Sequence, residues 1–219
     1  MNLRLPIDHV VVLVPDLEAA GSALEAAGFH VTPQARHSPA MGTANRCIML
    51  GDSYIEIMGI LAETPANATW RNLLAQGPGI RGLALSSTDI KASAKSLASH
   101  GVAVESVRHF SRMTDAGELS FSVTRIDPAT TPGLQCLVCQ HHTAGLLWRP
   151  EAMTHANGAV KLASVSLPQT FSLSALTKLE NRAGVAVQTA NNRLVLAGHR
   201  AQYHDLRDIC GLEIEIVAT

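Results

Sequence analysis

The stretch Arg36–Ile60, RHSPAMGTANRCIMLGDSYIEIMGI, places one acidic residue inside an otherwise apolar strand. That residue is Glu56, within Tyr-Ile-Glu-Ile. A buried glutamate is costly unless it is paired, hydrogen-bonded or bound to a cation. The candidate partner is His9, which is equally isolated in the apolar run Ile7–Val14. We therefore expect these two side chains to meet in the folded protein.

Composition limits the possible classes of protein. The 219 residues are 47% apolar, enough for a sizeable core. A net charge of -1 and 4% aromatic residues do not suit a protein that binds nucleic acid. The N-terminus lacks the apolar core of a signal peptide, and no apolar run reaches the roughly 18 residues of a membrane span. A folded, soluble, cytoplasmic protein is the expectation.

The four cysteines do not suggest a disulfide framework in a chain of this length without an export signal. Cys136 and Cys139 match C-x-x-C, but residues three apart on a strand point to opposite faces. We interpret them as packing residues, although a redox or metal-binding role is the alternative.

The chain repeats one pattern of elements with a shift of 73 residues. The first unit is predicted as a strand, a helix with an Asp16 cap and a Gly28 stop, and three strands, in the order Ile7–Val14, Asp16 to Gly28, Phe29–Thr32, Arg46–Leu50 and Ser53–Ile60. The second unit follows the same order, with elements at Ile80–Ser87, Asp89–Ser99, Val102–Phe110, Glu118–Ile126 and Leu134–Gln140.

A weaker third copy is predicted towards the C-terminus, with elements at Ala159–Leu167, Ser172–Arg182, Gly184–Val187, Arg193–Gly198 and Leu212–Val217. The fold class is therefore α+β, with three βαβββ modules that form curved mixed sheets. We expect residues 6–60 and 80–142 to pair within a domain of residues 1–145, and residues 146–219 to form the third module. That module could pack on the outside or across a homodimer interface, which would cover its unpaired sheet.

Three motifs connect this pattern with a known family. They are D-H-V-x-x-x-V-x-D-L from Asp8, G-T-x-N-R from Gly42 and G-D-x-Y-x-E-I from Gly51. With the repeats, the chain resembles the vicinal oxygen chelate superfamily, in its glyoxalase-like, bleomycin-resistance-like and dioxygenase-like branches. The resemblance implies a cup formed by two modules. It also implies a divalent metal held by His9 on the first strand and Glu56 on the last strand of the first module.

Imidazole and carboxylate ligands suit Zn, Fe, Mn, Ni or Co. The second copy has Gly82 in the slot of His9 and no carboxylate on its last strand. Two protein ligands alone make a poor site, so His141, His142 or Glu215 is the expected third ligand. The alternative is that His9 and Glu56 simply hydrogen-bond to each other in the core.

Further residues are candidates for the substrate site. Asn45 and Arg46 lie in the G-T-x-N-R motif, and a guanidinium at the rim of a cup could bind an anionic group. Trp148, in the long connection after the second copy, is either a substrate contact or a plug that fastens the connection. Arg46 has the alternative role of a surface salt-bridge partner.

The expected function is a metal-dependent glyoxalase-like enzyme of lyase, isomerase or dioxygenase type, acting on a small oxygenated metabolite. Glu56 and His141 are the candidate catalytic residues, and His9, Glu56 and His141 are the candidate metal ligands. The metal would act as a Lewis acid. The alternative is a metal-free protein that sequesters a small molecule in the same cup.

Overall fold

The computed structural model describes residues 5–168 and 186–219. The first module confirms the predicted order of elements, although its second strand is short and lies later in the chain than expected. Its elements are β1 (Ile7–Leu13), α1 (Leu17–Ala26), β2 (Ala35–Arg36), β3 (Thr43–Met49) and β4 (Tyr54–Ile60). Helix α1 forms as predicted because the Asp16 carboxylate accepts hydrogen bonds from the first-turn amides of Glu18 and Ala19.

The second module repeats the first. A linking segment carries α2 (Ala68–Leu74), and the module then has elements β5 (Gly79–Ser86), α3 (Ile90–Ser99), β6 (Arg108–Thr114), β7 (Gly117–Arg125) and β8 (Gln135–His141). In each module the first and last strands pair in parallel, and the remaining strands add antiparallel. The predicted duplication of a βαβββ unit is confirmed.

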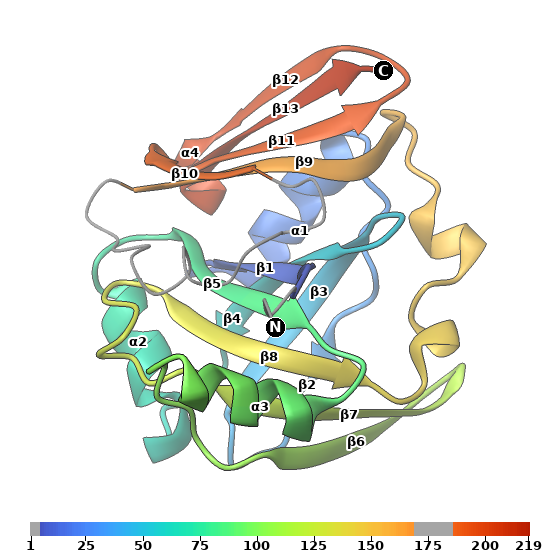
Figure 1. The fold of residues 1–219 in the computed structure, drawn as a ribbon. Helices are drawn as coiled ribbons and strands as arrows, with labels where there is room; N and C mark the ends of the chain where they lie inside the picture. The colour runs from blue at the N-terminus through green and yellow to red at the C-terminus, as the bar shows by residue number, and fades with distance from the viewer. Residues whose placement is uncertain (1–4, 169–185) are drawn as a thin grey trace.

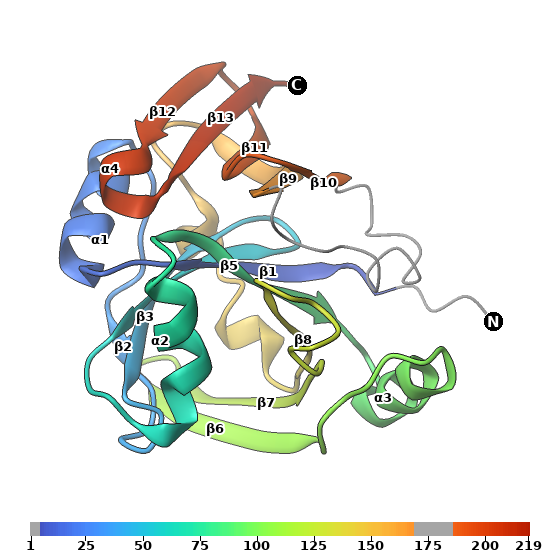
Figure 2. The same ribbon diagram turned by 90° about the vertical axis from the view of Figure 1, so that its left-hand side faces the viewer.

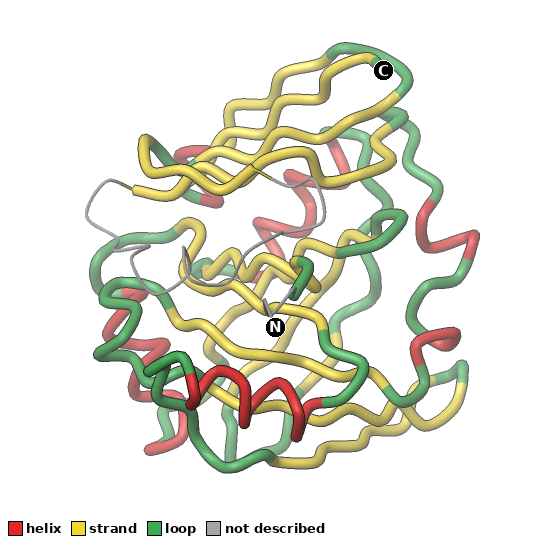
Figure 3. Tube along the Cα trace, in the orientation of Figure 1, coloured by secondary structure: helices red, strands yellow, loops and turns green. Residues whose placement is uncertain are grey.

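The two modules join through their first strands, because β1 pairs antiparallel with β5. The result is one eight-stranded sheet in the order β2-β3-β4-β1-β5-β8-β7-β6. This sheet curls into a cup, with β2 and β3 on one side and β6 and β7 on the other, as Figure 2 shows. Strands form most of the molecule (Figure 3), and α3 packs against β7 and β8.

The C-terminal part forms a separate five-stranded sheet on the outside of the cup (Figure 1). Its elements are β9 (Ala159–Pro168), β10 (Ala186–Ala190), β11 (Arg193–Gly198), β12 (Gln202–Leu206), α4 (Arg207–Cys210) and β13 (Leu212–Ala218). Apolar side chains of this sheet, such as Leu162, Leu194 and Ile214, share one core with Val10 and Val12 of β1. The core face of this sheet is thus covered within one chain. A homodimer was expected because it would cover this sheet, and that reason no longer applies.

The strand pairing of this sheet differs from the βαβββ order expected for a third module. In the order β10-β9-β11-β13-β12 the pairs are parallel, antiparallel, parallel and antiparallel. The same alternation occurs in β4-β1-β5-β8-β7 of the large sheet. The C-terminal sheet therefore resembles the centre of the paired modules. The predicted helix Ser172–Arg182 lies outside the described residues.

The connection between the two sheets is held by buried polar side chains. It contains two short 3-10 turns, Ala144–Leu146 and Pro150–Met153. His155 accepts a hydrogen bond from the amide of His30 at 3.0 Å and donates to the carbonyl of Met49 at 2.8 Å. Asn157 donates to the carbonyl of Ala27 at 2.9 Å. These bonds satisfy backbone groups of the first module, so the connection is fixed to it.

Within the described residues, no helix is long and apolar enough to cross a membrane.

Candidate functional site

Strand β1 directs two consecutive polar side chains towards the inside of the cup. Its register with β5 shifts between Ile7 and His9, so Asp8 is the extra residue of a bulge. Ile7 and Val10 therefore belong to the core behind the sheet, whereas Asp8 and His9 share the other face. His9 Nδ1 donates to Asp8 Oδ1 at 2.6 Å. Both residues are almost fully buried.

Strand β4 brings Glu56 to the same face. Glu56 lies in register with Val11 of β1 and Cys47 of β3. Its Oε2 atom lies 3.5 Å from His9 Nε2, and its Oε1 atom accepts a hydrogen bond from Asn45 Nδ2 at 2.6 Å. The predicted meeting of His9 and Glu56 is thus present, and each side chain is fixed by a second partner on its other polar atom.

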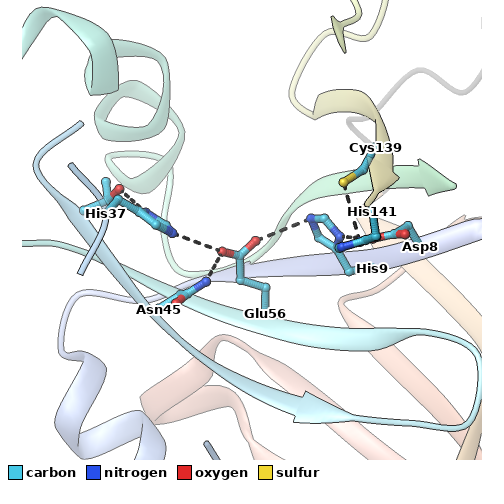
Figure 4. A network of polar contacts seen from close by, with 8 residues as sticks. Asp8, His9, His37, Asn45, Glu56, Cys139 and His141 are labelled. Carbon is cyan, nitrogen blue, oxygen red and sulfur yellow. Dashed lines mark hydrogen bonds and ion pairs between the residues drawn. The ribbon is translucent and has the colours of Figure 1, made fainter. Parts of the chain in front are cut away.

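The polar contacts extend on both sides of this pair, as Figure 4 shows. On one side, His37 Nε2 lies 3.8 Å from Glu56 Oε1, and its Nδ1 atom is 2.7 Å from the Thr43 hydroxyl. On the other side, His141 Nε2 from β8 lies 3.1 Å from Asp8 Oδ1 and 3.6 Å from Cys139 Sγ. The network therefore crosses the sheet from β3 to β8.

Charge concentrates at Asp8 and His9. Burial raises the pKa of Asp8, but hydrogen bonds from His141 and His9 outweigh it and lower this pKa to about 2. Burial likewise lowers the pKa of His9, but the hydrogen bond to Asp8 and the charges of Asp8 and Glu56 outweigh it, so the net shift is upward. Asp8 therefore acts as the fixed negative charge that orients the His9 ring.

Aromatic rings and a thiol enclose the network. The Tyr54 ring stacks on the His9 ring, with centroids 4.4 Å apart. Burial is the main cause that raises the pKa of both the Tyr54 hydroxyl and the Cys139 thiol. Both groups are therefore neutral near pH 7, and Cys139 is a poor metal ligand until it loses its proton.

A cavity of about 250 Å³ opens over this network. Its polar part includes His9, Asn45 and Glu56, together with His37 and His141. Its opposite wall comes from β6 and β7 of the second module and includes Phe110, Arg112, Leu119 and Phe121. A mostly apolar cavity with a few polar groups at one point is the usual form of a small-molecule site.

The donor atoms at His9 and Glu56 fit a divalent cation. Two ligands at about 2.1 Å from a tetrahedral ion lie roughly 3.4 Å apart, close to the 3.5 Å between His9 Nε2 and Glu56 Oε2. The hydrogen bonds from His9 to Asp8 and from Asn45 to Glu56 are the outer contacts that usually orient metal ligands. A second group, Asp8, Cys139 and His141, has ligand atoms within 4.8 Å of one another and could also hold an ion.

The structure does not bring the predicted ligands His9, Glu56 and His141 together as one set. Among residues 5–168 and 186–219, only Asp8, Cys139 and His141 converge as a group of three. His141 instead contacts Asp8, one residue away from His9. The other candidates for a third ligand lie elsewhere, because Glu215 pairs with Arg193 and His142 hydrogen-bonds to Ser122.

The slot equivalent to His9 in the second module is filled by an aromatic side chain. A Cβ atom at Gly82 would lie 2.9 Å from the Trp70 ring and 2.9 Å from Val11 Cβ. Trp70 of α2 packs there with Val11, Leu13 and Met58. The second module has no histidine at this position because apolar side chains, which we call the apolar plug, fill the space beside Gly82. Only the half of the cup that the first module forms therefore carries the polar group of His9 and Glu56.

The predicted substrate-binding residues have different positions. Asn45 lines the cavity and orients Glu56. Arg46 does not line it; its guanidinium pairs with Glu25 of α1 and donates to the carbonyl of Thr32 at 2.9 Å. The structure thus places Arg46 in the alternative role, as a fastening residue. Trp148 packs against the rings of His141 and Tyr54, with centroids 5.1 and 5.8 Å away.

Sequence reasoning missed Asp8, His37 and Arg112, and it interpreted Cys139 as a packing residue, with a redox or metal-binding role as the alternative. A signal existed for Cys139, because it is two residues from His141 on a strand and must share its face. Asp8 gave no such signal, since it shares the face of His9 only through the bulge.

Comparison with known proteins supports this fold. A family model for a glyoxalase-like domain matches residues 7–202, and the chain belongs to that family. No curated protein matches the chain. A hypothetical protein from Staphylococcus aureus has a similar structure, with a TM-score of 0.73 at 13% identity, covering 98% of this chain and 100% of its own.

Methylmalonyl-CoA epimerases also match in part. The enzyme from Mycobacterium tuberculosis has a TM-score of 0.48 at 22% identity and covers 62% of this chain and 87% of its own. A Streptomyces coelicolor epimerase variant in complex with 2-nitronate-propionyl-CoA has a TM-score of 0.49 at 22% identity and covers 65% and 100%.

Proposed function

We propose that the protein is a metal-dependent enzyme of isomerase or lyase type, which moves a proton on a small oxygenated metabolite. The observation that carries this proposal is the His9–Glu56 pair. Its two inner atoms lie 3.5 Å apart at the cavity, while Asp8 and Asn45 hold the outer atoms. A purely structural pair would not need a cavity beside it.

His9 and Glu56 would hold a divalent ion, which would supply Lewis-acid stabilisation of negative charge on a substrate oxygen. Asp8 keeps the Nδ1 proton on His9, so Nε2 presents its lone pair towards Glu56. Asn45 binds Glu56 Oε1 and leaves Oε2 directed towards His9 and the cavity. The sequence proposal of His141 as a direct ligand is replaced by a role that orients Asp8.

The chemistry assigned to Glu56 is proton transfer next to a carbonyl group. Glu56 Oε1 keeps one lone pair besides the bond from Asn45. This atom takes a proton from the carbon beside the carbonyl, and the electron pair of that C–H bond moves into the enolate of the substrate. Return of the proton to the other face, or loss of a neighbouring leaving group, completes isomerisation or elimination. The apolar walls exclude water, which strengthens these electrostatic contacts.

The arrangement of the site supports a dioxygenase reaction less well than isomerisation or elimination. Non-haem iron oxygenases use two histidines and one carboxylate around one ion. Within the described parts of the chain, His9, His141 and Glu56 do not converge in that way. The isomerase or lyase reaction needs only the His9–Glu56 pair.

Glu56→Gln tests the proposal, because it keeps the side-chain volume and removes the charge. The protein is loaded with Zn, Mn, Ni or Co and dialysed, and its metal content is measured by elemental analysis. Deuterium uptake at C3 of phenylpyruvate is then followed by NMR in heavy water. We expect Glu56→Gln to lose bound metal and to slow exchange by about 10²–10⁴-fold. Glu63→Gln, at an exposed salt bridge with Arg71, is the matched control and should change neither.

A normally metallated and active Glu56→Gln protein would refute the assignment. The second candidate, a metal-free binding protein, is favoured by the apolar plug at Gly82, which leaves one half of the cup without polar ligands. That candidate predicts a wild-type protein that binds phenylpyruvate, retains no metal and does not accelerate exchange.

A further inference from the structure

On the cavity wall opposite the His9–Glu56 pair, one guanidinium has two nitrogen atoms without a hydrogen-bond partner in the described part of the chain. Arg112 lies on β6 of the second module and lines the cavity. Its Nε and Nη1 atoms are buried, and among the described residues they have no hydrogen-bond partner. Buried polar groups in native proteins are paired, and an exception calls for an explanation at that place.

Two other arginines near the cavity are paired with carboxylates, unlike Arg112. Arg108 lines the same wall and pairs with Glu105 at 2.9 Å. Arg46 pairs with Glu25 on the other side of the sheet. Within residues 5–168 and 186–219, no carboxylate forms an ion pair with Arg112, so its positive charge remains available to an anion in the cavity.

The guanidinium shares its cavity with the polar end of the site. Arg112, His37 and Glu56 all line this cavity, and His37 Nε2 is 3.8 Å from Glu56 Oε1. A small molecule in the cavity can therefore reach both Arg112 and Glu56.

Much of the cavity surface near Arg112 is apolar. Phe110 and Phe121 stack on each other with centroids 5.6 Å apart, and Leu119, Met58 and Trp70 add further apolar surface to the lining. These side chains offer no hydrogen-bond donor to an anion apart from the indole of Trp70. An occupant with one anionic group and an apolar remainder fits Arg112 together with these side chains.

We propose that Arg112 binds the carboxylate of the substrate, so that the substrate is a small 2-oxo acid with an apolar side chain whose oxygenated carbons lie at Glu56. This substrate class rests on the proposed function. A planar guanidinium donates two N–H groups to a carboxylate, and such charge-assisted bonds also fix orientation. Arg112 would thereby set which carbon faces Glu56.

Isothermal titration calorimetry tests the proposal with phenylpyruvate and its neutral methyl ester as probes. We expect Arg112→Gln to weaken phenylpyruvate binding by about 10-fold or more and to leave ester binding unchanged. Arg112→Lys should lie between Arg112→Gln and the wild type, because it keeps the charge without the planar pair of donors. Arg108→Gln is the matched control on the same wall and should change binding less than about twofold.

Several outcomes would overturn the proposal. They are no binding of phenylpyruvate to the wild type, equal affinity of wild type and Arg112→Gln, or ester binding as tight as acid binding. Phenyl phosphate that binds tighter than phenylpyruvate, with the same dependence on Arg112, would assign a phosphate in place of the carboxylate. Metal content separates this test from the proposed function, because Arg112→Gln should retain metal whereas Glu56→Gln should lose it.

Discussion

Replacing Gly82 with alanine tests the apolar plug that fills half of the cup. The added Cβ would lie 2.9 Å from Trp70 Cη2, 2.9 Å from Val11 Cβ and 3.0 Å from Val11 Cγ2. Trp70 and Val11 are 5% and 2% exposed, so neither can move into solvent. Val11 Cβ is attached to the backbone of β1 and cannot be displaced by a change of rotamer.

The expected destabilisation follows from these contacts. Overpacking of a close-packed core costs about 1–3 kcal/mol. Loss of glycine freedom in the unfolded chain offsets about 0.4–1 kcal/mol of that. We expect Gly82→Ala to lower the free energy of unfolding by about 1–2 kcal/mol, which corresponds to a fall in Tm of about 2–8 °C for a chain of this size.

Urea unfolding at 25 °C, followed by circular dichroism, measures this change. Gly145→Ala is the matched control, because a Cβ there meets no atom within 4 Å, and it should be neutral or slightly stabilising. In a Trp70→Phe background the cost of Gly82→Ala should shrink without vanishing, since Val11 remains. A Gly82→Ala protein as stable as Gly145→Ala would refute the reasoning.

Other side chains give three further predictions. Arg46→Ala should lower the free energy of unfolding in urea by about 1–2 kcal/mol, because its bond to Thr32 is lost, and should leave phenylpyruvate affinity unchanged. His155→Ala should cost about 2–3 kcal/mol in the same assay, since two backbone groups lose their partner. Burial raises the pKa of Cys136 to about 12 and that of Cys210 to about 11. Near pH 8 these thiols should therefore react with a disulfide reagent only after unfolding, and rapid reaction in the native protein would contradict their burial.

The paired modules could be predicted because their signals are local. The Asp16 cap, the glycine stops and the alternation around Glu56 each fix an element or a face. The shift of 73 residues then adds a second unit of the same order, and the first strands supply the junction. Strand pairing in the C-terminal sheet depends on contacts between distant segments, which the sequence pattern does not reveal. The pattern Ile214-Glu215-Ile216 resembles the pattern around Glu56, but Glu215 lies in register with Val195 and Tyr203.

The candidate site could be predicted in part for a similar reason. Glu56 and His9 were found because each is polar within an apolar strand. The prediction that both Asn45 and Arg46 bind the substrate is wrong for Arg46. The two residues are adjacent on β3, and adjacent strand residues face opposite sides of the sheet. Asp8 is an exception to this alternation of faces, because the bulge in β1 turns its side chain to the face of His9.

Duplication followed by divergence of the two halves explains how one cup acquires two kinds of wall. The first module supplies His9, Asn45 and Glu56, which are fixed by hydrogen bonds on their outer atoms. The second module lacks these groups, because Trp70 occupies the equivalent half-site above Gly82, and its strand β6 presents Arg112 across the cavity. On the proposed function, chemistry and recognition therefore reside on opposite modules. A change in β6 could alter the substrate while the Glu56 network keeps its geometry, because Arg112 has no hydrogen bond to any described residue of that network.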